Sequence, residues 1–423
     1  MSIYSPSRSV PPEIWLQIFQ TATFIPGEWD VSATTSHPGL FTSWDTIQLT
    51  AHRGVLPLRR AIVQVSRLWW QIGSEVLYAS FHETTYYYFS HSHSLDHFER
   101  SLLSRPALGC HIKRLALQWP HKGSPSKIDH ILQLCPNTQI LSFYREEDPD
   151  LRAPWKPRIL VNHVRFFDAD VYGFSQKCIV HMLSSLPNVE VLHLTGLCAG
   201  DEESRYHGSL RLPLVHFLSL SSYGVEEVDE GFEYWTPLLS TADIPRLTSL
   251  STDLGGASLP FSIDVWQRIT FFNLFLGACS ALKPEIFRSL THLQLELKAK
   301  PLRHQQSHFP FHQLTHLTIL YHSVQHCVSQ WKQNVEVFLA LEMPLLRVIE
   351  LGWGKYGISD SHNLARGQGR YVEVFLDYLE SSAHKFEQVG IQFQEVYTED
   401  IYRVPIPIKD VIKSTRDGMA IRL

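Results

Sequence analysis

The apolar positions of this chain follow one period near its start and another period afterwards. In the segment PPEIWLQIFQTA, residues Ile14, Ile18 and Ala22 recur at helical spacing behind a proline that suits a helix start. From residue 81 onward, short segments alternate apolar and polar positions and are separated by turns and amphipathic stretches. Strict alternation is typical of a half-buried β-strand. The pattern therefore predicts N-terminal helices followed by alternating strands and helices.

The N-terminal helical pattern is interrupted by one long segment. Residues 24–57 are rich in Gly, Pro, Ser and Thr, so we expect an inserted loop there. Helical spacing resumes over residues 58–81, where a broad apolar face is formed by Ile62, Val65, Leu68, Trp69, Ile72, Val76 and Leu77. Residues 1–82 thus predict a small all-α module that contains an insertion.

The second part of the chain predicts a repeating unit of strand, turn and helix. From Leu117 onward, the central residues of successive strands lie 24 to 32 residues apart, except for two longer intervals of 43 and 42 residues. A proline stands shortly before several strands, as in SLPNVEVLHL and EMPLLRVIEL, where we expect it to end a helix and begin a turn. The predicted strand segments are 81–89, 111–119, 138–144, 161–168, 189–196, 215–222, 246–253, 290–297, 314–321, 345–352 and 386–393.

A period of about 20–29 residues with one strand and one helix is typical of leucine-rich repeats. One such unit cannot bury its apolar face alone, so neighbouring units have to stack. We therefore expect an α/β fold in which residues 83–423 form an irregular leucine-rich-repeat-like solenoid, or horseshoe. A doubly wound α/β domain has the same alternation and is the alternative. The L-x-x-L-x-L rhythm at short period favours the solenoid.

In such an array, the strand residues that point away from the core form an extended surface on which a partner binds. A slip of one residue in the predicted phase would exchange the inner and outer faces. The positions that we predict for this surface are Lys113, Gln118, His193, Thr195, Ser219, Ser221, Gln294 and Glu296.

Two motifs of the N-terminal module resemble the F-box family. The sequence VPPEI (10–14) followed by Ile18 is similar to the family's Leu-Pro-x-Glu-Ile/Leu motif with an isoleucine four residues on. The sequence VSRLW (65–69) is similar to its Val-Cys-x-x-Trp motif. Val10 and Ser66 replace the usual Leu and Cys, and the insertion separates the two motifs more widely than usual. An F-box followed by leucine-rich-like repeats is a known pairing, and this version looks like the large F-box families of mushroom-forming fungi.

The resemblance implies a substrate receptor of an SCF-type ubiquitin ligase, which acts in ubiquitin-dependent protein degradation. The F-box would bind a Skp-type adaptor and, through it, a cullin-RING ligase, while the repeats hold an unknown target protein. The chemistry would then lie in other subunits, so this chain is not expected to be an enzyme. A scaffold that works outside ubiquitination is the alternative. The implied adaptor-binding residues are Pro11, Pro12, Ile14, Ile18, Leu58, Val65, Ser66 and Trp69.

Composition and charge narrow the range of partners. The formal net charge of −5 provides no field that favours nucleic acid or an anionic membrane. We find no signal-peptide pattern at the N-terminus and no run of eighteen apolar residues, so neither secretion nor a membrane span is expected. The six cysteines are scattered and form no CxxC pair, which is typical of reduced thiols in a cytoplasmic or nuclear protein.

Two patterns suggest chemistry but are interpreted otherwise. GWGKYG (352–357) is a literal GxGxxG, the basis for a remote alternative in which the chain is a nucleotide-dependent enzyme. The bulky Trp353 stands in its turn, so we expect a connection between repeats. His304, His308, His312 and His316 recur every four residues, but Pro310 interrupts any helix that would align them as metal ligands. The sequence therefore predicts no cofactor and no metal site.

Overall fold

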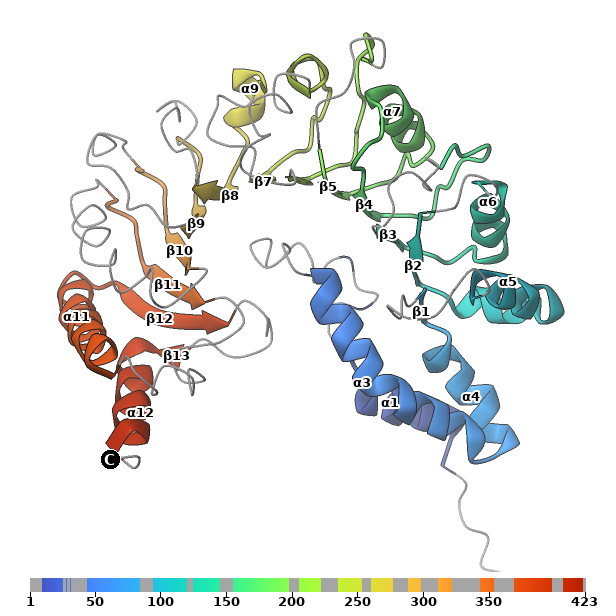
Figure 1. Cartoon of the computed structure of the whole chain (residues 1–423), viewed down its shortest axis with the longest axis horizontal. Helices are drawn as coiled ribbons and strands as arrows, with labels where there is room; N and C mark the ends of the chain where they lie inside the picture. Colours follow the sequence, from blue (N-terminus) through green and yellow to red (C-terminus); the bar gives the residue numbers. More distant parts are fainter. Residues whose placement is uncertain are drawn as a thin grey trace, which may run out of the picture. The chain divides into compact units, whose positions relative to one another are not determined.

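The computed structural model describes residues 10–25, 28, 31, 44–83, 94–119, 125–144, 155–197, 205–221, 235–252, 260–276, 288–297, 311–321, 343–353, 369–397 and 406–420 (Figure 1). In this described part, thirteen strands form one mostly parallel sheet whose strand order follows the chain from β1 to β13. Helices alternate with many of the strands, so the fold is mixed α/β. Among the described residues, no helix combines the length and the apolar character needed to cross a membrane.

Two compact units divide the chain. The first contains the described residues up to Asp170 together with Cys178–Val191, and the second contains Val171–Lys177 and the described residues from Leu192 onward. The N-terminal helices thus share one unit with the first four strands.

The N-terminal part of the first unit is helical. Its main helices are α1 (Pro12–Ala22), α3 (Trp44–Gln64) and α4 (Arg67–Leu77). The prediction of a loop over residues 24–57 is wrong for residues 44–57, which belong to α3. The helix contains Pro57 in its interior, although a proline there removes one backbone hydrogen bond. Packing offsets that loss, because Arg59 and Ile62 are buried on the same helix.

Residues 58–77 form two helical segments rather than one continuous pattern, and residues 80 and 81 belong to a strand. The second segment, α4, begins after Ser66, whose hydroxyl accepts a hydrogen bond from the backbone N–H of Trp69 at 3.1 Å. Such a cap satisfies a donor that the helix itself cannot pair. On either side of the break, Val65 and Leu68 are 62% and 46% exposed. The helical spacing predicts that Val65 and Leu68 lie on an apolar face packed against the core, and this prediction is wrong for both residues.

Strands and helices alternate after α4. The first elements are β1 (Ser80–His82), α5 (Ser94–Ser104), the 3-10 helix η2 (Pro106–His111), β2 (Arg114–Gln118), α6 (Pro125–Leu134), β3 (Ile140–Tyr144) and β4 (Phe166–Asp170). They are followed by α7 (Gln176–Ser184), β5 (Val191–Thr195), β6 (Phe217–Leu220), β7 (Ser249–Thr252), α9 (Ile263–Trp266), β8 (Phe271–Leu276) and β9 (His292–Leu297). The last described elements are β10 (His316–Tyr321), β11 (Val348–Trp353), α11 (Gly369–Gln388), β12 (Gln392–Tyr397), the antiparallel β13 (Ile406–Pro407) and α12 (Ile408–Ala420).

Parallel pairing places equivalent residues of successive strands side by side. In the first unit, Leu115 pairs with Leu141, which in turn pairs with Phe167. Every member of this core row is buried, as is every member of its counterpart in the second unit. Each unit therefore has a continuous apolar core along its strands. The counterpart row consists of Leu218, Leu250, Phe272, Leu293, Leu317, Ile349 and Phe393.

One type of turn leads into many of the strands. In each case a backbone N–H donates to the carbonyl three residues earlier, and a proline is the second residue of the turn, where its fixed φ fits. The donor and acceptor residues are Thr138 and Cys135, Val189 and Leu186, Val215 and Leu212, Leu247 and Ile244, and Leu346 and Met343, at 3.1–3.3 Å. The prediction that prolines mark the turn before a strand is confirmed at these positions.

The 43-residue interval between two predicted strands contains a further strand, β8. It pairs in parallel with β7 and β9 and places Phe272 between Leu250 and Leu293. The spacing along the core row is then 22 and 21 residues, so the repeat is regular where it had seemed to be interrupted. The sequence FFNLFL lacks a clear alternation of apolar and polar positions, which is why the pattern did not reveal it.

The last predicted strand, 386–393, is largely wrong. Helix α11 runs to Gln388, and β12 begins only at Gln392. Phe386 at the end of the helix and Phe393 in the strand are both buried, and their ring centroids lie 5.4 Å apart. The end of the helix and the start of the strand thus supply apolar residues to the same core within a few positions. In the sequence, this succession of apolar residues looks like the alternation of a single strand.

We expect Leu250→Ala to lower the free energy of unfolding by about 2–5 kcal/mol, because it opens a cavity in the core row. The matched control is Leu345→Ala, since Leu345 is 49% exposed in the turn before β11 and should cost about 0.5 kcal/mol or less. Urea unfolding of the two variants measures the difference. Equal losses would contradict the assignment of the core row.

Candidate functional site

The N-terminal helices pack around a small core of their own. The ring of Trp69 lies 4.8 Å from the ring of Trp15 and 4.8 Å from that of Phe19. Gly73 lets α4 approach α3 closely, because a Cβ atom there would lie 2.9 Å from Cγ2 of Ile62. Trp69 therefore serves the internal packing of the helices. The buried core residues are Phe19, Ile62 and Val76, and the half-buried residues against them are Trp15, Leu16, Trp69 and Ile72.

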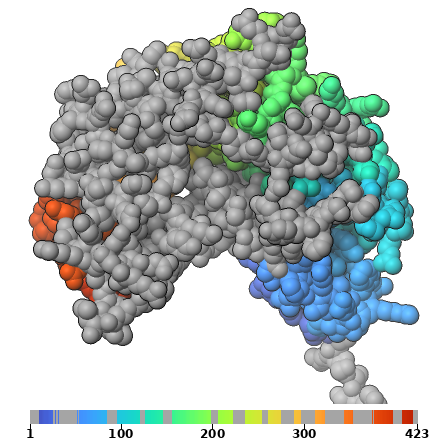
Figure 2. Space-filling view, viewed as in Figure 1, coloured from blue at the N-terminus to red at the C-terminus, as the bar shows by residue number. Residues whose placement is uncertain are grey.

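A second group of apolar side chains on the same helices is exposed. Ile14 and Ile18 lie one turn apart on α1 and are 43% and 46% exposed, while Leu58 on α3 is 44% exposed. Figure 2 shows the N-terminal helices, in blue, at the surface of the molecule. Removing exposed aliphatic side chains from water on binding a partner contributes favourable free energy to the complex. We call these residues the apolar set: Val10, Ile14, Ile18, Leu58, Val65 and Leu68.

The remaining predicted docking residues start helices. The carbonyl of Pro11 accepts a hydrogen bond from the N–H of Ile14 at 3.0 Å, and Pro12 is the first residue of α1. Ser66 caps α4. The eight predicted residues thus fall into three groups: exposed apolar side chains (Ile14, Ile18, Leu58, Val65), helix starts (Pro11, Pro12, Ser66) and internal packing (Trp69).

The predicted binding surface on the strands is only partly accessible. Gln118, His193, Thr195 and Ser221 are half-buried on the side of the strands opposite the core row. Lys113 is also half-buried but precedes β2, where its N–H donates to the carbonyl of Ala79 at 2.8 Å. The side chain of Glu296 lies outside the described residues.

Ser219 and Gln294 do not contribute to a surface, because each is only 3% exposed. Both side chains lie on the side of the strands opposite the core row, as predicted. At these positions, however, that side is not accessible to solvent. Ser251 and Asn273 in the same register are also buried, and the Asn273 amide donates to the Ser251 hydroxyl at 3.0 Å. The alternation of a strand separates two faces, but it does not indicate which of them reaches solvent.

An accessible polar stretch lies instead on β9 to β12. The Thr318 hydroxyl donates to Glu350 Oε2 at 2.8 Å, and the Gln394 amide donates to Glu350 Oε1 at 3.0 Å. Both carboxylate oxygens are therefore held, and the negative charge is fixed in place. We call the exposed and half-buried members the polar strip: His292, His316, Thr318, Glu350, Gln392 and Gln394.

Sequence reasoning missed the polar strip, although one signal pointed to it. The tetrapeptide LTHL occurs at 290–293 and again at 314–317, a separation that matches the repeat. In-register parallel strands bring equivalent residues of such repeats together. His316 consequently lies beside His292 on the neighbouring strand.

The glycine motif and the histidine run are only partly within the described residues. Gly352 and Trp353 belong to β11, and Gly352 pairs with Leu320 and Val396 on the flanking strands. Residues 354–357, His304 and His308 lie outside the described part. The first glycine is therefore a strand residue rather than part of a turn after a strand.

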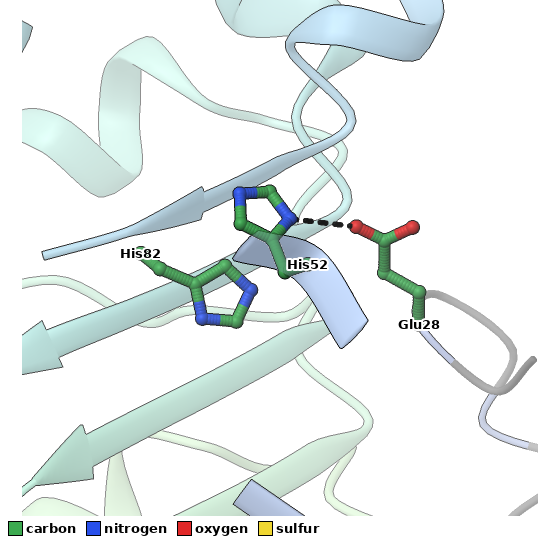
Figure 3. Close-up of side chains that lie close together, drawn as sticks. All are labelled: Glu28, His52 and His82. Carbon is green, nitrogen blue, oxygen red and sulfur yellow. Dashed lines mark hydrogen bonds and ion pairs between the residues drawn. The ribbon is translucent and has the colours of Figure 1, made fainter. Parts of the chain in front are cut away.

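A buried polar cluster joins the helices to the first strand (Figure 3). Arg59 of α3 donates to both carboxylate oxygens of Glu28, at 2.7 Å to Oε1, and to the carbonyl of Thr23 at 2.9 Å. His52, also on α3, lies 3.2 Å from Glu28 through Nδ1, and its ring centroid lies 4.3 Å from that of His82 on β1. The cluster thus connects the segment between α1 and α3 with α3 itself and with β1.

The cluster is better suited to an ion pair than to a metal. The ligand atoms of Glu28, His52 and His82 lie within 4.8 Å of one another, a grouping that suits a metal such as zinc. Arg59 already engages both oxygens of Glu28, however, and its positive charge opposes a second cation. Burial acts to raise the pKa of Glu28, but the hydrogen bonds from Arg59 and His52 outweigh it and hold the pKa below its ordinary value of 4.5.

Comparison with known proteins assigns no family to this chain. The chain matches none of the models of known protein families, and no curated protein matches it significantly. The function proposed below therefore rests on the motifs and contacts of this chain.

We expect Glu28→Gln to destabilise the protein most strongly at neutral pH, by about 3–5 kcal/mol, because it leaves the buried Arg59 without its counter-charge. Since the folded pKa of Glu28 is depressed, the ion pair contributes fully above the unfolded value of 4.5 and is lost as the pH falls through the folded pKa. The difference in unfolding free energy between wild type and variant should therefore shrink between pH 7 and pH values below 4.5.

The control for this measurement is Glu387→Gln. Glu387 is exposed and forms an ion pair with Lys409 at 2.5 Å, so solvent screens it and its loss should leave the unfolding midpoint nearly unchanged. A difference for Glu28→Gln that does not change with pH would exclude the buried ion pair as its cause.

Proposed function

We propose that this chain is a substrate receptor of an SCF-type ubiquitin ligase. Its N-terminal helices act as an F-box that docks on a Skp-type adaptor, and its strands form a leucine-rich-repeat-like solenoid that holds a target protein. The observation that carries the proposal is the exposure of Ile14, Ile18, Leu58 and Val65, four of the positions that the resemblance to the F-box family implies for adaptor binding.

The contrast between two groups of apolar residues supports this docking role. Phe19 on α1 is buried in the core of the helices, whereas Ile18 next to it is 46% exposed. The helices therefore fold around one apolar group while a second group stays accessible. Fully burying an aliphatic side chain contributes about 1.5–3 kcal/mol. A few such anchors supply most of the free energy of a typical protein interface.

The strands support the second half of the proposal. Parallel strands in chain order, each with one residue in a buried apolar row, are what a solenoid of strand–helix units requires. The polar strip on β9 to β12 supplies hydrogen-bond donors and acceptors together with the fixed charge of Glu350. A surface of this kind favours a polar or basic segment of a folded partner.

The proposed role assigns no chemical step to this chain. Ubiquitin transfer takes place on other subunits of the ligase, and the receptor increases the rate by holding the target close to them. The cullin-RING ligase would be reached only through the adaptor. A scaffold outside ubiquitination is distinguished from this role by whether adaptor and cullin bind.

We expect the full chain to form a stable complex with a Skp-type adaptor. Ile18→Asp should weaken that complex by at least about 30-fold, because a charge then replaces a side chain that is buried in the complex and contributes about 2 kcal/mol or more to binding. Co-expression followed by calorimetry measures the effect. The variant should fold normally, since Ile18 is already 46% exposed. Trp69→Asp is unsuitable as a test because Trp69 packs inside the module.

The matched control is Leu103→Asp on α5, an apolar residue that is 52% exposed outside the apolar set. It should bind the adaptor like the wild type. The proposal is wrong if the wild-type chain binds no Skp-type adaptor, or if Ile14→Asp and Ile18→Asp together leave the affinity unchanged.

A further inference from the structure

Two histidines of the polar strip stack on neighbouring strands. His292 on β9 pairs in register with His316 on β10, their ring centroids lie 4.3 Å apart, and the ring planes differ by only 8°. Phe271 and Val348 occupy the equivalent positions on the strands to either side. The two imidazoles therefore form a defined pair within the second compact unit.

Each ring is held by the threonine that precedes it. Nδ1 of His292 lies 2.9 Å from the hydroxyl of Thr291, and Nδ1 of His316 lies 2.9 Å from the hydroxyl of Thr315. Each hydroxyl also donates to the backbone carbonyl of the preceding repeat at 3.0 Å, to Thr270 and Thr291 respectively. The repeated threonine thus gives both rings the same support.

The hydrogen count then assigns the tautomer of both rings. A hydroxyl has a single proton, and here that proton is directed to the carbonyl. With that proton on the carbonyl, the threonine oxygen accepts a hydrogen bond from Nδ1–H, and Nε2 of each neutral ring keeps its lone pair. Because both rings bind their threonines in the same way, their Nε2 atoms occupy equivalent positions in the pair.

The pair offers imidazole nitrogens on the same face of the strands as a carboxylate. Neutral imidazole is the form that binds metals. Glu350 meanwhile keeps a fixed negative charge on the same face, which attracts positive charge to it.

We propose that His292 and His316 bind a divalent transition-metal ion of the zinc or nickel class through their Nε2 atoms. Imidazole nitrogen selects these ions over calcium and magnesium, which prefer oxygen ligands. The Nδ1–H donation to threonine is the outer support that metal-binding histidines commonly have. This site is independent of the proposed role as a substrate receptor.

Both rings have to tilt before they can share one ion. Stacked rings whose planes differ by 8° direct their in-plane Nε2 lone pairs along parallel lines rather than toward one point. Zinc–nitrogen bonds of about 2.0–2.1 Å at a tetrahedral angle place two nitrogens about 3.4 Å apart, so each ring has to turn on its side chain until the two lone pairs converge. His292 is exposed and His316 half-buried, so the rings have room to tilt and water can complete the coordination.

Calorimetric titration of the full-length protein with zinc chloride tests the proposal. His292→Gln and His316→Gln should each remove one zinc equivalent relative to the wild type. Thr291→Val and Thr315→Val should keep that equivalent but weaken its affinity about 10–100-fold, because they remove the outer support. His207→Gln is the control, since His207 is an exposed histidine away from the pair and its loss should leave this equivalent in place.

Circular dichroism distinguishes loss of binding from loss of folding, and glutamine at these two accessible positions should leave the spectrum unchanged. The proposal is overturned if the folded His292→Gln and His316→Gln variants bind as many zinc equivalents as wild type, with the same affinity. In that case the two rings contribute stacking alone.

Discussion

The structure depends on one packing constraint, the in-register stacking of apolar residues along parallel strands. Leu115, Leu141 and Phe167 form such a row in the first unit, and a longer row runs from Leu218 to Phe393 in the second. Each residue is buried only because the strands on either side supply their own members of the row. A single repeat therefore has no independent stability, and the neighbours define its conformation.

The same register decides what happens on the opposite side of the strands. Because equivalent positions are neighbours, like residues accumulate in rows whether they are apolar or polar. One polar row is buried at Ser251, Asn273 and Gln294 and becomes accessible further along the sheet, at Thr318, Glu350 and Gln394. In the N-terminal helices, by contrast, the core combines aromatic residues of α1 and α4 with aliphatic residues of α1, α3 and α4, while other aliphatic residues on these helices remain uncovered. The two candidate surfaces of the molecule thus have different physical origins.

The insertion in the N-terminal module has a structural role in this arrangement. Glu28 lies in that insertion, and its carboxylate is bound by Arg59, while the ring of His52 lies tilted against that of His82 on the first strand. Because separating the two groups of a buried ion pair leaves an uncompensated charge, the pair ties the segments that carry them together. The insertion therefore orients α3, which carries Leu58, with respect to the beginning of the sheet within the first unit. Sequence composition indicated only that this segment departs from the helical pattern.

Much of the fold could be predicted from the sequence because period and proline position are local signals. Helix α1, the strands around Leu117, Leu141 and Leu192, and the turns before them follow directly from those signals. Strand β8 and helix α3 did not, because the first lacks alternation and the second contains Pro57. The exposure of Ile14 and Ile18 agrees with their motif positions, whereas the burial of Ser219 and Gln294 depends on contacts that no single repeat encodes.

The recurring proline turn has a consequence for how this chain tolerates change. Every strand that is entered through this turn starts at the same point relative to its predecessor, as the shared hydrogen bonds require. Among the strands that are entered in this way, the distance along the chain to the equivalent residue of the preceding strand differs, with 26 residues between Leu115 and Leu141 and 32 between Leu317 and Ile349, and the difference is accommodated after one strand and before the next turn. Lengthening the chain on that side leaves the stacking undisturbed, so we expect insertions to be tolerated at the ends at which the strands finish.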